Sequence, residues 1–296
     1  MIPTVLALLL ACSGTDSLRY QDSMELLGIN GDGVLVDARV TWGNEGLLAG
    51  QSELTFDLIQ RRSEPVHYRQ LALPERSTHE ATSLVAADDS LEKEGDDWVI
   101  NVNSEDLKAR LTLEPRVQGA IPSAGDEAWQ VSAPVMAGSL RGFWQAGSRG
   151  GLVDGRGLLT RRRGADAPGL RGVERLGVYV LGDDVSIGVD QTGAVLNAWA
   201  LAGDLMLPTD DVVTTRTKRG FRIDLRPAID LVVKVQVRNQ RLRSGRWDHL
   251  TSLERWLLKA IIGRPVRNTR AATATVITEE GSPRSYPAMV VTVNYK

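Results

Sequence analysis

The sequence of 296 residues contains a single cysteine, Cys12. An internal disulfide is therefore excluded, and so is a zinc site built from paired cysteines. Stability must come from the packing of a core. A chain of this length is long enough to form one large domain or two ordinary ones.

Histidine is almost as scarce, and the usual catalytic motifs are missing. His67, His79 and His249 are the three histidines, and no two of them have the short spacing of a local metal site. The sequence has no HExxH, no GxSxG and no Gly-rich phosphate loop. We therefore expect neither a metal nor a cofactor.

The chain also lacks a strong excess of charge of either sign. Its net charge of -2 excludes a globally basic nucleic-acid-binding protein, and we expect no nucleic acid partner. Residues 75–127 carry mainly acidic charges and residues 212–270 mainly basic ones. This asymmetry indicates complementary packing or solvated faces, and the alternative is a basic surface that faces anionic lipid headgroups.

No apolar run is long enough to cross a membrane as a helix, which takes about 20 residues. Residues 1–11 form a short apolar stretch, which predicts a signal peptide. The sequence Leu-Leu-Ala-Cys that ends at Cys12 resembles the bacterial lipobox, in which the cysteine receives diacylglycerol and becomes the mature N-terminus. We expect Cys12 to be lipidated, although an apolar first strand with a buried cysteine is an alternative.

The resemblance to sorted lipoproteins also predicts a location. Residues 12–24 would be a linker between the lipid anchor and the folded part. Ser13, which follows the cysteine, favours the periplasmic face of the outer membrane, so we expect a protein of the bacterial cell envelope.

Most of the remaining chain alternates apolar and polar residues with a period of two, which is typical of β-strands. In the segment 34–42, alternate residues share one apolar face, with Asp37, Arg39 and Thr41 on the other. The residues of the apolar face are Val34, Val36, Ala38, Val40 and Trp42. The segment 54–58 repeats the pattern with Asp57 on its polar face. Many short strands at near-regular spacing predict an all-β fold of sandwiches or barrels.

Two segments depart from this pattern. Residues 251–262 predict an amphipathic helix, because Thr251 and Glu254 have capping-box spacing before an apolar stripe. The Gly-rich segment 164–172 interrupts the strands, and we expect it to separate two β domains. These domains would span residues 25–163 and 173–296.

Aromatic residues are few, and several of them fall on predicted strands. Trp42, Phe56, Trp144 and Trp199 are the candidates for the wall of an apolar cavity, because a small barrel can enclose one ligand. The alternative is that they are ordinary core residues.

Three residues are candidates for acid–base chemistry. Asp154 and Glu174 flank the mid-chain linker and could protonate an alkene if they were buried, because burial raises the pKa of a carboxyl group. His249 has an acidic neighbour in sequence. Placement on the surface is the alternative for all three.

The order of these motifs resembles the tandem-lipocalin family that includes carotenoid 1,2-hydratase (hydroxyneurosporene synthase). The segments that carry the resemblance are Gly33 to Arg62, Asp97 to Pro115, Gly151 to Arg161, and Arg246 to Leu250 with the helix after it. It implies two lipocalin-like β domains that handle a long apolar molecule. Members that hydrate carotenoids need a buried acid, and no acidic residue of this sequence maps onto that acid.

Three functions follow as hypotheses. The first is an envelope lipoprotein that binds or carries a hydrophobic small molecule, a lipid or isoprenoid, in a lipocalin-like cavity. The second is a hydratase or isomerase, a lyase in the case of the hydratase, that acts on such a molecule. The third is a structural or protein-interaction lipoprotein with filled β domains.

Overall fold

The structure is a computed structural model that describes residues 21–43, 50–60, 63–120, 129–164, 174–193, 195–207, 209, 211–226, 231–245, 265–278 and 282–295. This part of the chain consists of β-strands, turns and one short 3-10 turn, η3 (Pro74–Arg76), and contains no α-helix. The prediction of an all-β fold is confirmed. The predicted signal peptide, Cys12 and the predicted helix 251–262 lie outside the described residues, within which no helix is long and apolar enough to span a membrane.

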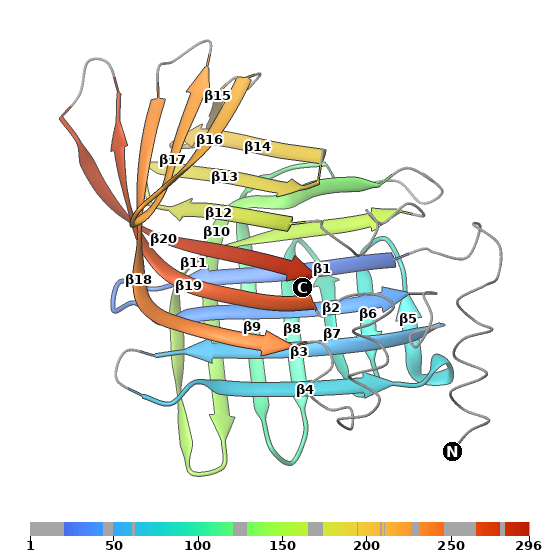
Figure 1. Cartoon of the computed structure of the whole chain (residues 1–296). Helices are drawn as coiled ribbons and strands as arrows, with labels where there is room; N and C mark the ends of the chain where they lie inside the picture. The colour runs from blue at the N-terminus through green and yellow to red at the C-terminus, as the bar shows by residue number, and fades with distance from the viewer. Residues whose placement is uncertain are drawn as a thin grey trace.

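The first half of the chain forms an eleven-stranded antiparallel sheet (Figure 1). Its strands are β1 (Gln21–Ile29), β2 (Leu35–Gly43), β3 (Gln51–Ile59), β4 (Val66–Ala72), β5 (Ser77–His79), β6 (Ser83–Ala86), β7 (Asp89–Glu94), β8 (Asp97–Asn103), β9 (Lys108–Gln118), β10 (Gln130–Ala146) and β11 (Arg149–Gly164). The order in the sheet is β4-β3-β2-β1-β11-β10-β9-β8-β7-β6-β5. Its two edges, β4 and β5, are adjacent in sequence, and β6 contacts β2 and β3, so the sheet curls into a near-barrel.

The second half forms a nine-stranded antiparallel sheet. Its strands are β12 (Glu174–Leu181), β13 (Val185–Thr192), β14 (Val195–Ala202), β15 (Leu205–Leu207), β16 (Asp211–Thr217), β17 (Gly220–Arg226), β18 (Leu231–Gly245), β19 (Pro265–Ile277) and β20 (Arg284–Tyr295). The order is β15-β14-β13-β12-β20-β19-β18-β17-β16. This sheet curls into a half-barrel, and the edge strands β15 and β16 are again neighbours in sequence.

The change from one sheet to the other falls in the Gly-rich segment between β11 and β12. The start of the first sheet differs from the expectation. β1 begins at Gln21, whereas residues up to 24 were expected to belong to a linker. The reason is that Asp22 and Met24 are fully buried, so these positions belong to the core.

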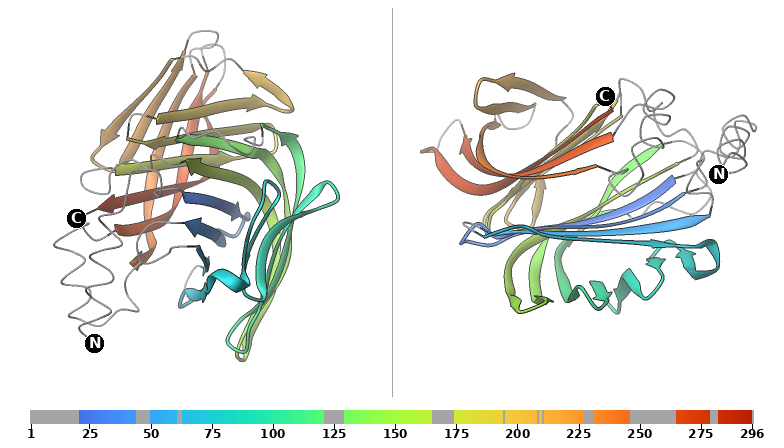
Figure 2. Two further views of the ribbon diagram at one scale, coloured as in Figure 1. Left: turned by 90° about the vertical axis from the view of Figure 1, so that its right-hand side faces the viewer. Right: turned by 60° about the horizontal axis from the view of Figure 1, so that its bottom comes forward.

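The two sheets pack against each other (Figure 2). This contact buries one face of β1, and the interior of the first sheet buries the other. On β1, Met24 and Leu26 point to the cluster inside the first sheet, whereas Leu27 and Ile29 point to a cluster between the sheets. β1 contacts β20, β3 contacts β18, and β10 contacts β13 and β14. The polar side chains that alternate with the inner core on these strands therefore face the second sheet.

Candidate functional site

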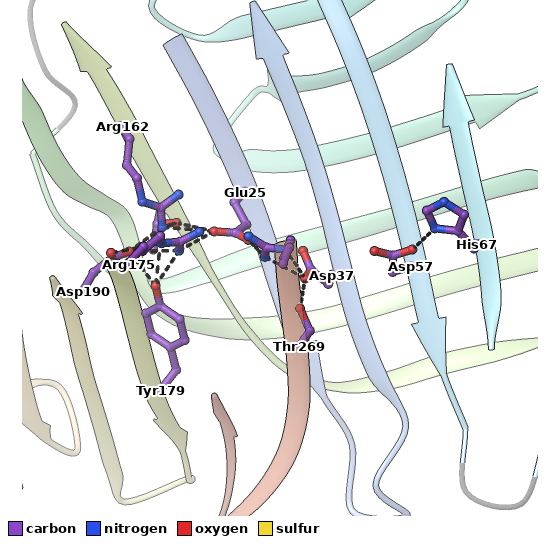
Figure 3. Close-up of polar contacts among 11 residues, drawn as sticks. Glu25, Asp37, Asp57, His67, Arg162, Arg175, Tyr179, Asp190 and Thr269 are labelled. Carbon is purple, nitrogen blue, oxygen red and sulfur yellow. Dashed lines mark hydrogen bonds and ion pairs between the residues drawn. The ribbon is translucent and has the colours of Figure 1, made fainter. Parts of the chain in front are cut away.

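The contact between the two sheets contains a group of buried charges beside its apolar cluster (Figure 3). Three carboxylates and three guanidinium groups form ion pairs there, and all six side chains are buried. They are Glu25, Asp37 and Arg162 of the first sheet and Arg175, Asp190 and Arg267 of the second. We call this group the inter-sheet ion layer. Its formal charges cancel, which a buried group requires.

Glu25 on β1 is the carboxylate that connects most of the layer. Arg162 Nη2 donates to Glu25 Oε2 at 3.0 Å and Arg175 Nη2 donates to the same oxygen at 2.7 Å. Arg267 Nη2 donates to the other oxygen. One carboxylate thus ties β11, β12 and β19 to β1.

Asp190 on β13 has the corresponding position in the second sheet. The Tyr179 hydroxyl donates to its Oδ2 at 2.6 Å, and Arg175 Nη2 donates at 3.1 Å. Burial raises the pKa of Asp190, but the charges of Arg162 and Arg175 outweigh burial and hold that pKa well below its ordinary value. Asp190 is therefore ionised at neutral pH and serves as a structural counterion.

Asp37 and Asp57 form a different arrangement, a pair of carboxyl groups on neighbouring strands. They are directly opposite each other on β2 and β3, and each is 2% exposed. Side chains in such positions have Cβ atoms about 5 Å apart. Two carboxyl groups that share a buried site cannot both ionise at ordinary pH.

Each member of the pair has its own hydrogen-bond partners. Asp37 Oδ2 accepts from Arg267 Nε at 3.0 Å, from Arg267 Nη2 at 2.7 Å and from the Thr269 hydroxyl at 2.5 Å. Asp57 Oδ1 lies 2.5 Å from Nδ1 of His67 on β4. The His67 side chain is 47% exposed, so it connects the buried pair to solvent.

The surroundings of the pair raise the pKa of both groups. Burial, and then the charge of Asp57, raises the pKa of Asp37 to about 6. Burial also raises the pKa of Asp57, against the hydrogen bond from His67. Because Arg267 and Thr269 donate to Asp37 and favour its charged form, we place the retained proton on Asp57. Such a pair can donate a proton from one member and accept one on the other.

The four residues expected to line a ligand cavity lie in two different clusters. Phe56 and Trp144 belong to the packed cluster inside the first sheet, and Trp42 packs against it. Trp199 instead lies between the sheets, with its ring centroid 6.1 Å from that of Tyr179. The four do not share one cavity, because Trp199 lies on the face of the second sheet that packs on the first. Ligand binding by the other three stays a prediction.

Of the three candidates for acid–base residues, only Asp154 has a described side chain. Asp154 is 82% exposed and lies 3.6 Å from Arg141, so it lacks the burial that would make it a proton donor. Glu174 is the first residue of β12, and its side chain, like all of His249, lies outside the described residues. Among the residues that the structure describes, no cluster of three potential metal ligands occurs.

Asp37 and Asp57 were missed because each reads as an ordinary polar-face residue of an alternating strand. One signal in the sequence points to them. Residues 26–29 of β1 are apolar or glycine at successive positions, which is typical of a strand buried on both faces. The polar faces of the strands beside β1 are then candidates for burial too.

Neither a protein-family sequence model nor a curated protein matches this chain. Solved structures do match it over nearly its whole length. The crystal structure of CghA with Sch210972 has a TM-score of 0.66 at 10% identity and covers 94% of this chain and 89% of CghA. The AttH-like protein NE1406 of Nitrosomonas europaea has a TM-score of 0.61 at 14% identity, with 96% and 95% covered. Kievitone hydratase from Nectria haematococca has a TM-score of 0.56 at 10% identity, with 97% and 92% covered.

These likenesses span both sheets and define the class of fold. The chain has the two-sheet, lipocalin-like β fold of these proteins. The tandem arrangement implied by the resemblance to the carotenoid hydratase family is thereby confirmed as a fold. At identities of 9 to 14% the likeness concerns the fold alone, so function has to be argued from the site.

Proposed function

We propose that this protein is an acid–base enzyme of the hydratase or isomerase type that acts on a hydrophobic small molecule. The observation that carries the proposal is the buried pair Asp37 and Asp57, directly opposite each other on β2 and β3. The pair supplies the buried acid that the sequence alone does not reveal.

The chemistry follows from the two states of the pair. A neutral carboxyl group donates a proton to a carbon-carbon double bond or a carbonyl group, and the ionised partner accepts a proton from water or from a neighbouring carbon. Hydration and isomerisation both begin with this protonation of the substrate. After the reaction Asp37 holds the proton that it accepted, and because the two carboxyl groups are directly opposite each other this proton can pass from Asp37 to Asp57 and restore the starting state. The half-exposed His67 contacts Asp57 throughout.

The likeness to solved structures adds support. Kievitone hydratase is named for a hydration, and CghA was solved with Sch210972. A shared fold does not transfer a reaction, because one fold carries many activities. It does supply the first compounds to try as substrates.

The test is a search for turnover in labelled water. The purified protein is incubated with farnesol, lycopene and kievitone in D₂O and in ¹⁸O-labelled water, and products are analysed by mass spectrometry. Deuterium on carbon reports protonation and ¹⁸O reports hydration. Asp37→Asn and Asp57→Asn should each lower the rate about a hundredfold or more.

Asp154→Asn is the matched control, because the same change at the exposed Asp154 should leave the rate unaltered. Turnover that survives both Asp37→Asn and Asp57→Asn would refute the assignment of the pair. Circular dichroism of each variant checks that the fold is retained.

A carrier without chemistry is the second candidate. It is favoured by three aromatic residues of the first sheet: Phe56 and Trp144 belong to its inner cluster, and Trp42 packs against that cluster. Native mass spectrometry of the purified protein tests it. A single apolar compound that co-purifies and stays unchanged in labelled water supports the carrier over the enzyme.

We also propose that the protein is held at the bacterial cell envelope by lipid on Cys12, after removal of residues 1–11. Two or three acyl chains anchor a domain firmly where one would be marginal. Expressed in bacteria with labelled palmitate, the full chain should take up label and sediment with membranes, and Cys12→Ser should do neither. An unlabelled wild-type chain would end this part of the proposal.

A further inference from the structure

Arg163 on β11 is a buried arginine that pairs with no carboxylate of the described residues. Its side chain is 2% exposed. Arg163 Nε lies 3.5 Å from Gln130 Oε1, a long contact, and Nη2 has no hydrogen-bond partner. The other buried arginines of the described chain, at positions 161, 162, 175 and 267, each pair with a carboxylate.

The guanidinium group of Arg163 faces the inside of the first sheet. Side chains alternate along β11, so Arg161 and Arg163 share the face of Leu159, which belongs to the inner cluster. Arg162 between them faces the second sheet. The Arg163 position is thus separated from the inter-sheet ion layer by the sheet itself.

A single row of residues crosses four strands at this end of the sheet. Trp42, Asp22, Arg163 and Gln130 are directly opposite one another on β2, β1, β11 and β10. The row continues to Ser52 on β3, whose buried hydroxyl also lacks a partner. Two unpartnered polar groups therefore face the same interior.

The carboxylate nearest along the row is already engaged. Asp22 accepts from Arg161 Nε at 2.9 Å and lies 2.8 Å from His79 Nε2. Burial raises the pKa of Asp22, but the hydrogen bonds from His79 and Arg161 lower it further, so Asp22 is ionised and balances Arg161. Within the described part of the chain, Asp22 therefore does not balance the charge of Arg163.

Two side chains at this end of the inner cluster are partly exposed to solvent. Trp42 is partly exposed and stacks on the ring of His79, with centroids 4.4 Å apart and planes within 9°. The His79 side chain is 28% exposed. The Arg163 charge thus lies at a polar, partly exposed end of the interior, next to the apolar inner cluster.

We propose that Arg163 binds the carboxylate of an amphiphilic small molecule, whose apolar part lies against Trp42 and the inner cluster of the first sheet. A buried cation without a counterion is strongly unfavourable, and a carboxylate is the group whose geometry a guanidinium matches best. A small free anion would lose its hydration free energy on entering this buried site and would gain no apolar contact. An anion with an apolar tail offsets that loss, because its tail is removed from water as well. The site lies on the opposite face of the sheet from Asp37 and Asp57 and does not depend on their chemistry.

The test compares three probes on the purified chain: dodecanoate, acetate and dodecanol, each below its aggregation limit. Dodecanoate should raise the Tm of the wild-type protein and bind measurably by titration calorimetry. Arg163→Met should weaken dodecanoate binding about tenfold to a hundredfold, the effect of losing a charged hydrogen bond. Without ligand, Arg163→Met should have a Tm equal to or above that of the wild type, because it removes the unbalanced charge.

Arg141→Met is the matched control, since Arg141 is 67% exposed and should leave dodecanoate binding unaltered. If Arg163→Met fails to fold, Arg163→Lys replaces it and should also weaken binding. Unchanged affinity in the Arg163 variant overturns the site. If acetate binds as tightly as dodecanoate, the apolar tail plays no part and the site is not specific for an amphiphile. If dodecanol binds as tightly as dodecanoate, the carboxylate and the charge of Arg163 play no part.

Discussion

At the scale of single residues, the two carboxyl groups of Asp37 and Asp57 have the largest consequence. Each would be unremarkable on the surface. Placed directly opposite each other and buried, both have a raised pKa. Burial and the charge of Asp57 raise the pKa of Asp37 from an ordinary value of 3.8 to about 6. A carboxyl group with a raised pKa binds its proton more tightly in the folded than in the unfolded chain, so this pair makes stability depend on pH.

The sign of this dependence is defined. From about pH 4 to about pH 6 the free energy of unfolding should fall by up to about 3 kcal/mol because of Asp37, and above that range its contribution should be constant. Asp37→Asn should remove this fall. Urea unfolding at pH 4, 5, 6 and 7 measures it, with Asp154→Asn as the exposed control. Parallel curves for wild type and Asp37→Asn would contradict the raised pKa.

At the scale of elements, close approach of strands depends on glycine at particular positions. Gly188 on β13 is directly opposite Trp199 on β14. A Cβ atom added at Gly188 would lie 2.0 Å from Trp199 Cζ2, and the Trp199 ring is itself packed between the sheets. The small residue on one strand therefore allows the large one on the next to fill the sheet contact.

Gly188→Ala should lower the free energy of unfolding by about 1 to 3 kcal/mol, because the Trp199 ring has to move within a packed layer. Urea unfolding followed by tryptophan fluorescence checks this. Gly31→Ala is the control, since a Cβ there meets nothing within 4 Å. If Gly188→Ala lowers the free energy of unfolding no more than Gly31→Ala does, the Trp199 ring can shift without cost and the explanation is wrong.

At the scale of the whole molecule, the inter-sheet ion layer belongs to both sheets at once. Glu25 of the first sheet holds Arg175 and Arg267 of the second, and Arg162 of the first holds Asp190 of the second. Neither sheet can separate without leaving buried charges unpaired. We therefore expect both sheets to unfold together, as one transition in scanning calorimetry with equal calorimetric and van't Hoff enthalpies.

Glu25→Gln should destabilise the protein by about 3 to 5 kcal/mol, because it leaves three arginines without a shared counterion. Glu94→Gln is the matched control. Glu94 pairs with Arg110 on the surface, where an ion pair contributes about 1 kcal/mol or less. Two separate transitions in the wild type, or similar losses in both variants, would contradict the coupling of the sheets.

Much of the fold was predictable because strand alternation is local. The alternating apolar residues from Val34 to Trp42 and from Leu54 to Leu58 share one face in the sequence, and in the structure they belong to the inner cluster or pack against it. The Gly-rich segment 164–172 lies where one sheet gives way to the next. The early start of β1 was missed because the burial of Asp22 depends on Arg161, which is far away in sequence.

The sequence by itself determined which residues alternate, and hence that the chain is a set of strands with an inner and an outer face. Only the tertiary structure decided which outer face is buried. Asp37 and Asp57 lie on polar faces in either case, but the second sheet packs on those faces and removes the water that would have kept their pKa ordinary. The physical reason is that alternation is set by neighbours along the chain, whereas desolvation is set by what packs against it from elsewhere.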